Sequence, residues 1–190
     1  MDTAALAFLG QRRSTPSRLL GEPGPDAGQL AAMLQLALRV PDHGRLAPWR
    51  FLRIAGEHRH ALGAALAQVF VDEHPDADAH LVERERGRFA FAPVIVVVIG
   101  RIAPGHRIPE VEQRLSGGAL CLQLQLAAHG HGFGSQWLTG WAAYHPRIHA
   151  ALGLAADEEI LGFIHLGTPI ADSPERERPD VATLLADWPA

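Results

Sequence analysis

Arginine, histidine and serine side chains gather in two short stretches in the first third of the chain. The first is RRS, at residues 12 to 14. The second is RVPDHGRLAPWRF, at residues 39 to 51, which contains three arginines and one histidine. Guanidinium groups form paired, charge-assisted hydrogen bonds with phosphate and carboxylate oxygens. The two stretches therefore favour a binding site for an anion, and a polar surface loop is the alternative for each.

The sequence lacks the residue sets of nucleophilic, metal-dependent and dinucleotide-binding sites. The chain has no Gly-x-Ser-x-Gly elbow, and its single cysteine, Cys121, lies in the apolar run GGALCLQLQLAA, which predicts inert packing. The histidine pairs HRH and HGH have no accompanying Cys or Glu-x-x-His set, so we expect no metal site. The glycines of GHGFGS follow a helix and open a strand, which is the reverse of a dinucleotide-binding loop and predicts a helix stop. We assign no catalytic side chain.

Composition bounds the class of protein. The chain has 190 residues, of which 47% are hydrophobic and 20% charged, as expected for one globular domain over residues 1 to 190. A net charge of -4 argues against nucleic-acid and membrane-surface partners. The longest apolar run, PVIVVVIG at 93 to 100, is too short to cross a bilayer as a helix, and the first residues do not form a secretion signal. We expect a cytoplasmic protein.

The elements that must position these residues follow from hydrophobic periodicity. Helices are expected over residues 3 to 11, 26 to 40, 57 to 72, 109 to 129, HLVERERGRF and HPRIHAAL. Strands are expected over residues 49 to 55, 93 to 100, GFGSQWL and EEILGFIHLGTP. The side chain of Asp26 is expected to cap the second helix together with Gln29. This order predicts an α+β fold, with a small sheet wrapped by helices and extended arms at both ends.

Two further stretches carry expectations about packing. The charged VERER and GRFAFAP segments are interpreted as a solvated helix face. Gly117 and Gly118 lie inside the longest predicted helix, where each glycine costs about 1 kcal/mol relative to alanine. Such a pair needs a compensating close approach of another backbone. A helix crossing at a dimer interface would supply it.

Taken in order, RRS, RVPDHGRLAPWRF, the glycine-containing long helix, GHGFGSQWLTG and FIHLGTP resemble the nitroreductase family of FMN-dependent oxidoreductases. The resemblance is strongest to the short YdjA-like branch and covers nearly the whole chain. It implies a nitroreductase-like FMN-binding fold with a small, mostly antiparallel central sheet. It also implies an intertwined homodimer with extended terminal arms, in which residues from about 175 to 190 pack on the partner subunit and each FMN lies at the interface.

The same resemblance implies three groups of FMN-binding residues. The group expected at the phosphate, ribityl chain and pyrimidine edge of FMN comprises Arg12, Arg13 and Ser14, completed at the phosphate by Arg176 and Arg178. The group expected to reach FMN from the other subunit comprises Arg39 and His43. The group expected along the flavin ring comprises Trp137, Leu138 and Thr139. The loop at 42 to 49 departs from the Ser-Ser-x-Asn-x-Gln-Pro-Trp pattern of many members, so the usual amide contacts of that loop are missing.

The implied activity needs no acid, base or nucleophile from the protein. The resemblance implies that FMN takes up hydride from NAD(P)H at its N5 atom and passes it, in a ping-pong reaction, to nitroaromatic, quinone or related small acceptors. Two alternatives remain open at this stage. One is a flavin-dependent dehydrogenase or flavin-fragmenting enzyme on the same fold, and the other is a flavin-binding dimer without enzymatic activity.

Overall fold

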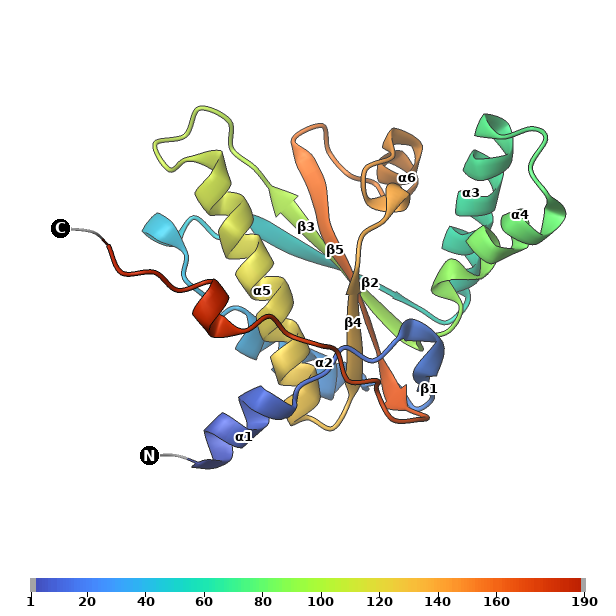
Figure 1. Ribbon diagram of the computed structural model, residues 1–190. Coiled ribbons are helices and arrows are strands. Elements are labelled where there is room, and N and C mark those ends of the chain that lie inside the picture. Colours follow the sequence, from blue (N-terminus) through green and yellow to red (C-terminus); the bar gives the residue numbers. More distant parts are fainter. Residues whose placement is uncertain (1–2, 189–190) are drawn as a thin grey trace.

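The sheet is arranged around its longest strand, β5 (Glu158–Pro169). Along one edge β5 pairs with β3 (Val94–Arg101), which pairs in turn with β2 (Trp49–Ala55). On the opposite edge it pairs with β4 (Gly134–Leu138), and its last residues pair with the short β1 (Leu20–Gly21). All of these pairings are antiparallel in the computed structural model, which describes residues 3–188 (Figure 1).

Helices cover both faces of this sheet (Figure 1). The α-helices are α1 (Thr3–Gln11), α2 (Ala27–Ala37), α3 (Glu57–Glu73), α4 (Ala79–Arg86), α5 (Glu110–Gly130) and α6 (Pro146–Ala151). Short 3-10 helices are η1 (Ser17–Leu19), η2 (His43–Arg45), η3 (Gly87–Phe89), η4 (Trp141–Ala143) and η5 (Val181–Thr183). The predicted α+β class with an antiparallel sheet is confirmed, and among residues 3–188 no helix is long and apolar enough to cross a membrane.

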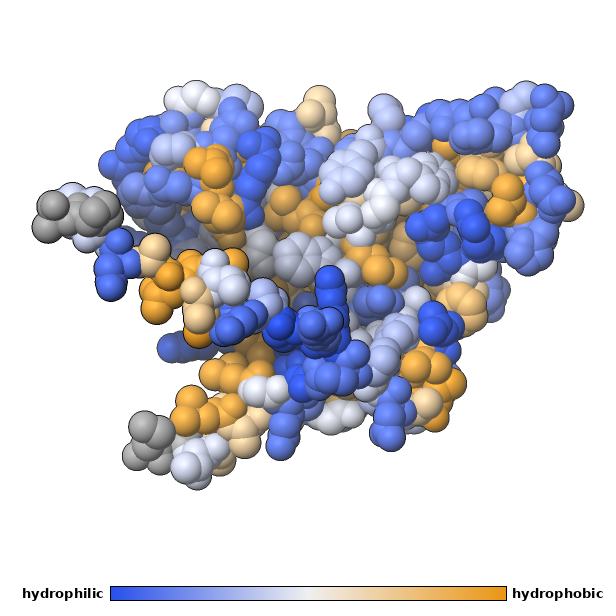
Figure 2. Space-filling view, in the orientation of Figure 1, coloured by the Kyte–Doolittle hydropathy of each residue, from blue (hydrophilic) through white to orange (hydrophobic). Residues whose placement is uncertain are grey.

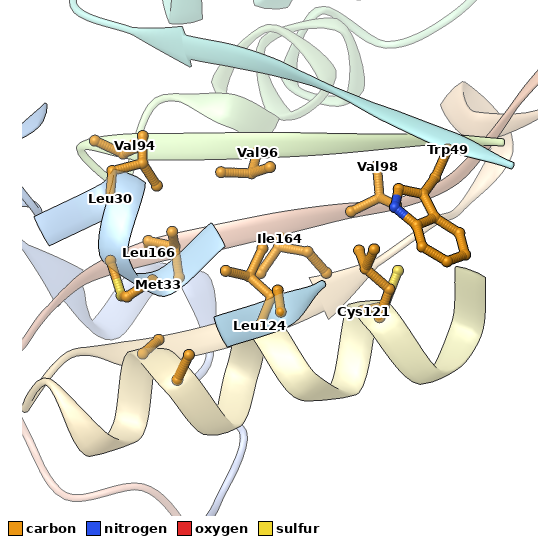
Figure 3. Packing of buried hydrophobic residues seen from close by; sticks show 14 residues of the cluster. Leu30, Met33, Trp49, Val94, Val96, Val98, Cys121, Leu124, Ile164 and Leu166 are labelled. Atoms are coloured by element: carbon orange, nitrogen blue, oxygen red, sulfur yellow. The ribbon is translucent and has the colours of Figure 1, made fainter. Parts of the chain in front are cut away.

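Strand β3 contributes to two hydrophobic cores because successive side chains of a strand point to opposite faces. Val94, Val96 and Val98 pack under α2 and α5, as Figure 3 shows. The alternate residues, from Ile95 to Ile99, pack with α3, α6 and η3 on the other face. Burial on both faces explains why the sequence of this strand is a continuous apolar run.

The layer of α2 and α5 confirms two local predictions. Asp26 caps α2 by accepting a hydrogen bond from the backbone N–H of Gln29, whose side chain in turn accepts from the N–H of Asp26. Cys121 is fully buried in the core beneath α5 (Figure 3), and burial raises the pKa of its thiol to about 12. An uncharged, inaccessible thiol is inert, as the sequence indicated.

The two glycines of α5 have different surroundings. A Cβ atom on Gly117 would lie 2.2 Å from Cδ1 of Leu161, so Gly117 brings α5 close to strand β5 of its own chain. A Cβ atom on Gly118 would meet only the ring of Trp137, at an ordinary 3.8 Å. The explanation of Gly117 by a crossing between two chains was therefore wrong, because contacts inside the chain account for that residue.

Both ends of the described chain present apolar side chains to solvent. Helix α1 has no buried residue, and Leu6 and Leu9 on it are more than half exposed. At the other end Leu184, Leu185 and Trp188 are at least 71% exposed. Figure 2 shows hydrophobic side chains on both terminal segments, beside α5. Helix α5 itself exposes Val111, Leu115 and Leu122. One chain leaves this apolar surface uncovered.

His165 lies in β5 on the face covered by α3 and is fully buried. Its ring stacks on Phe89 with centroids 5.6 Å apart, and neither ring nitrogen has a hydrogen-bond partner. Burial lowers the pKa of the imidazole to about 4, so the ring is neutral in the folded chain at neutral pH.

This burial predicts a loss of stability in mild acid. Between its ordinary pKa of 6.5 and its folded-state pKa of about 4, His165 binds a proton only in the unfolded chain. The free energy of unfolding should therefore fall by about 2 kcal/mol between pH 7 and pH 5. Urea unfolding at the two pH values measures this difference.

The variant His165→Leu is the control for this prediction, because leucine keeps the site apolar and does not titrate. Most of the difference between pH 7 and pH 5 should disappear in it. The hydrogen bond with Arg50 is the main cause that lowers the pKa of Glu158 to about 2. Glu158 therefore loses its contribution to the free energy of unfolding only below its ordinary pKa of 4.5, which is outside the range from pH 7 to pH 5. An equal pH dependence in the wild type and in His165→Leu would assign the loss to other groups.

Candidate functional site

The segment that carries RRS runs beside strand β4. The backbone N–H of Thr15 donates to the carbonyl oxygen of Ser135 at 2.9 Å, and that of Ser17 donates to Oε1 of Gln136 at 2.6 Å. The hydroxyl of Thr15 also lies 2.8 Å from the hydroxyl of Ser173, beyond the end of β5. These contacts bring three distant parts of the sequence to one edge of the sheet.

A cavity of about 560 Å³ forms between two of these parts, the N-terminal segment and the segment that follows β5. Its walls are residues 12 to 14 of the N-terminal segment and residues 174 to 179 of the C-terminal segment, and they include four arginines and two glutamates. Figure 2 shows strongly hydrophilic side chains in this region, where Figure 1 shows the C-terminal segment passing in front of the N-terminal one. The structure thus brings together RRS and the later basic pair, as the sequence predicted. We call this the arginine cavity.

Arg12 is the arginine of this cavity that has a buried and unpaired donor. Its Nη1 atom is buried and has no hydrogen-bond partner. Burial lowers the pKa of its guanidinium, and the neighbouring charges of Arg178 and Arg13 lower it further. A buried N–H donor among like charges is unfavourable unless an acceptor with negative charge is present. Phosphate oxygens supply both properties, so the residues present fit the phosphate group of a bound cofactor.

Arg13 makes contacts within the chain. Its Nε donates to Oε2 of Glu175 at 2.7 Å, and an Nη atom forms a shorter contact with the same oxygen. Its other Nη atom donates to the carbonyl oxygens of Gly10 and Arg12. The ion pair with Arg13 is the largest cause that holds the pKa of Glu175 below its ordinary value. Arg13 thus fastens the C-terminal segment over the N-terminal one.

The remaining residues predicted for this half of the site line the same wall. Ser14 is exposed at the cavity, and Arg176 and Arg178 project from the C-terminal segment. An Nη atom of Arg178 donates to the carbonyl oxygen of Arg176 at 2.6 Å, which orients its guanidinium along its own segment. Sequence reasoning missed Glu175, because its partner Arg13 is 162 positions away.

The end of β4 lies close to the arginine cavity, since Gln136 and Ser135 hold the N-terminal segment there. Trp137 is 37% exposed and packs across Gly162, where a Cβ atom would come within 2.1 Å of the indole nitrogen. That nitrogen donates to the carbonyl oxygen of Leu161 at 3.0 Å, so the ring is fixed against β5. Leu138 and Thr139 follow, both partly buried. Together these three residues form a surface of mixed polarity.

Arg39 and His43 lie apart from the arginine cavity within one chain. Arg39 is exposed just after α2. His43 pairs with Glu112 at the start of α5, with 2.6 Å between Nδ1 and Oε2, and lines a separate cavity of about 310 Å³ with Leu115 and Ser116. The structure therefore does not bring these two residues to the site formed by Arg12. Their assignment depends on a second copy of the chain.

The charged stretch after α3 differs from its sequence interpretation. Glu85, expected on a solvated face, is only 1% exposed, and Phe89 is 2% exposed. The carboxylate of Glu85 accepts from Arg88 and from the indole N–H of Trp141, which is 56 positions away. The interpretation was wrong for these two residues, because hydrogen bonds and packing with η4 bury them, which periodicity within VERER does not reveal. It holds for Glu83, Arg84 and Arg86, which are exposed.

A cavity suited to an anion, at the sheet edge near the exposed ring of Trp137, fits a ligand that carries both a phosphate group and an aromatic ring. The chain belongs to the nitroreductase family, whose family profile matches residues 9–168. The match includes RRS and the residues of β4, and it ends before Arg176 and Arg178. The family predicted from the sequence is confirmed, and with it membership of a family of oxidoreductases.

Relatives and solved structures agree with this membership. The chain is 36% identical over 165 residues to "Putative NAD(P)H nitroreductase YdjA" of Escherichia coli (strain K12), covering 87% of this chain and 88% of that protein. It is 31% identical over 174 residues to "Putative NAD(P)H nitroreductase" of Haemophilus influenzae, covering 91% and 92%.

Two crystal structures share the fold. The nitroreductase-like family protein of Bacillus cereus is 25% identical, with a TM-score of 0.86 over 99% of this chain and 97% of that one. A protein of Desulfovibrio desulfuricans described as "a putative nitroreductase in complex with fmn" is 24% identical, with a TM-score of 0.75 over 100% of this chain and 99% of that one.

The contacts of Arg13 predict that Arg13→Gln loosens the C-terminal segment without unfolding the protein. The pair with Glu175 is partly exposed, so we expect a stability loss below about 1 kcal/mol. Cleavage after Glu175 by a glutamyl endopeptidase should accelerate by about threefold to tenfold, because the segment detaches more often. Arg18→Gln, which changes an exposed arginine of the same N-terminal segment, should leave the cleavage rate unchanged. Equal cleavage rates for both variants would contradict the fastening role.

Proposed function

We propose that this chain binds FMN with its phosphate in the arginine cavity and uses NAD(P)H to reduce small acceptors such as nitroaromatics or quinones. The observation that carries the proposal is Arg12, which places a buried N–H donor without a partner among other cations. A phosphate dianion satisfies that donor and offsets the charge. The names of the relatives, which specify NAD(P)H, and the FMN in the Desulfovibrio structure support the same reading.

The residues of the arginine cavity have different parts in this proposal. Arg12 binds the phosphate, with Arg176 and Arg178 adding charge from the C-terminal segment and Ser14 offering a hydroxyl at the rim. Arg13 holds that segment in place through Glu175 and contacts FMN from there. Trp137, Leu138 and Thr139 lie along the flavin ring. FMN, when bound, supplies the hydride chemistry, so the chain has to bind, orient and shield the ring without a dedicated acid or base.

The second half of the site comes, in this proposal, from a second copy of the chain. Arg39 and His43 are remote from the arginine cavity of their own chain, and the apolar surfaces of α1, α5 and the C-terminal segment are uncovered. An intertwined homodimer of single-domain subunits covers these surfaces, with residues from about 175 onward lying across the partner. It also delivers Arg39 and His43 to the FMN of the other subunit.

The experiment that tests the activity is anaerobic mixing of the FMN-loaded protein with NADPH or NADH. Loss of the oxidised-flavin absorbance, followed by its return on adding a nitroaromatic or quinone, is the expected result. Bleaching without reoxidation by any acceptor tested would indicate another flavin-dependent reaction on this fold. A flavin that neither nucleotide bleaches would indicate a flavin-binding dimer without reductase activity.

Arg12→Gln should weaken FMN binding and spare riboflavin binding. Loss of one charge-assisted contact to a phosphate oxygen costs about 1.5–3 kcal/mol, which raises the dissociation constant of FMN roughly tenfold to hundredfold. Riboflavin lacks the phosphate and serves as the matched ligand, so its dissociation constant should change by less than about threefold. Fluorescence titration measures both. Equal losses for the two flavins would place Arg12 away from the phosphate.

Leu115→Glu should separate the subunits and release FMN together. Leu115 is 67% exposed on α5, and a charge buried there at an interface has no partner to offset its desolvation. Val71→Glu introduces the same charge at an exposed apolar position on α3 and should have neither effect. Light scattering after gel filtration, read beside flavin absorbance, measures both properties. A wild-type monomer that retains one FMN per chain would rule out the shared site.

A further inference from the structure

Glu85, at the end of α4, is a buried carboxylate that accepts two short hydrogen bonds from Arg88, one from Trp141 and a long one, at 3.5 Å, from the exposed Arg84. Arg88 donates to both of its oxygens, from Nε at 2.8 Å and from Nη2 at 2.7 Å. The indole N–H of Trp141 donates to Oε2 at 2.9 Å. With only 1% of the residue exposed, water contributes little to holding this charge. The geometry of the three side chains is therefore tightly coupled.

Both partners of Glu85 act on the turn that follows β4. Trp141 is the first residue of η4, and Gly140 precedes it with a φ of 67°. A Cβ atom on Gly140 would lie 3.2 Å from Nη1 of Arg88, so the guanidinium rests against the backbone of that turn. The carboxylate thus fixes Trp141 directly and Gly140 through Arg88.

A second contact holds the same turn from α3. The ring of His145 meets the ring of Trp141 edge-on, with centroids 5.6 Å apart. His145 is itself bonded to Glu73, with 2.7 Å between Nε2 and Oε1. The turn is therefore attached to both helices that follow β2. We call Glu85, Arg88 and Trp141 the turn clamp.

Stability alone does not explain the turn clamp. A buried ion pair is commonly no more stabilising than well-packed apolar residues of the same volume. The ion pair does fix the orientation of the side chains, because a forked guanidinium and an indole N–H each donate hydrogen bonds only over a narrow range of geometries. The segment given this fixed geometry begins directly after Thr139, at the end of the surface proposed for the flavin ring.

We propose that Glu85 and Arg88 are positioning residues, which act through Gly140 and Trp141 to hold residues 137 to 141 in the position that supports and orients the flavin ring for hydride transfer. This inference rests on the proposed function, since it assumes a flavin beside Trp137. It assigns a role to α4 and η3, which are outside the arginine cavity. Neither Glu85 nor Arg88 touches the flavin.

The test compares Glu85→Gln and Trp141→Phe with Glu83→Gln. The change Glu85→Gln keeps the size of the side chain and removes its charge, and Trp141→Phe removes only the N–H and part of the ring. Glu83 lies on the same helix and pairs with Arg86 at the same three-residue spacing, but it is exposed. Trp141→Phe carries the test on its own if Glu85→Gln does not fold.

The first measurement needs no flavin. The amides of Ala143 and Tyr144 donate to the carbonyl oxygens of Gly140 and Trp141 at 3.2 and 3.0 Å, so their hydrogen exchange reports opening of the turn. Exchange at both amides should be about tenfold faster in Glu85→Gln and Trp141→Phe, as expected for loss of one charge-assisted hydrogen bond. Glu83→Gln should match the wild type. Equal exchange in the wild type and all three variants would contradict the role of the turn clamp. That result would not bear on the proposal that the chain binds FMN.

The second measurement uses the FMN-loaded protein. Both clamp variants should bind FMN within about threefold of the wild type, show altered circular dichroism of the flavin, and be reduced by saturating NADPH about tenfold to hundredfold more slowly. The doubly substituted protein should be no slower than the slower single variant, because both changes open one unit. Reduction at the wild-type rate, or slowing that multiplies in the double variant, would overturn the positioning role. A wild-type protein that binds no FMN would instead remove the proposed function.

Discussion

Strand β5 is hydrogen-bonded along both edges, and the location of the site depends on this pairing. Because β3 occupies one edge, β4 has to pair on the other, with Ser135 opposite Leu166. The N-terminal segment then adds to the outside of β4, and the chain that leaves β5 returns across it through the Thr15 and Ser173 hydroxyls. The arginines near the two ends of the sequence lie close together because the pairings of β3 and β4 with β5 are both fixed in register.

Two concentrations of buried or half-buried charge lie on either side of β4, and they differ in how they are balanced. The charge in the turn clamp is balanced, because both oxygens of Glu85 accept from Arg88 and one of them also accepts from Trp141. The arginine cavity is incomplete, because Arg12 keeps a buried donor without a partner and has cations as neighbours. A cluster whose charges are balanced within the chain can serve to hold the fold in place. A cluster with an unpaired buried donor is the one expected to bind a ligand. Between them lies the surface of Trp137, Leu138 and Thr139.

Sequence reasoning succeeded where the signal is local. The capping of α2 by Asp26 depends on residues three positions apart, and the apolar run of β3 follows from burial on both faces. Strand β1 was not predicted, because two residues carry no periodicity. The burial of Glu85 and the engagement of Arg13 with Glu175 were also missed, since each depends on a partner that only the fold brings near. The joining of RRS to the later arginines was predicted by resemblance and not by any pattern within those residues.

The central claim is that the arginine cavity receives the phosphate of FMN and that the end of β4 carries its ring. A crystal structure of the protein with FMN tests this most directly. The account predicts a phosphate oxygen within hydrogen-bonding distance of Nη1 of Arg12 and the flavin ring along Trp137 and Thr139, with His43 of a second copy approaching the same flavin. FMN bound with its phosphate outside the arginine cavity, or with its ring away from β4, would contradict it.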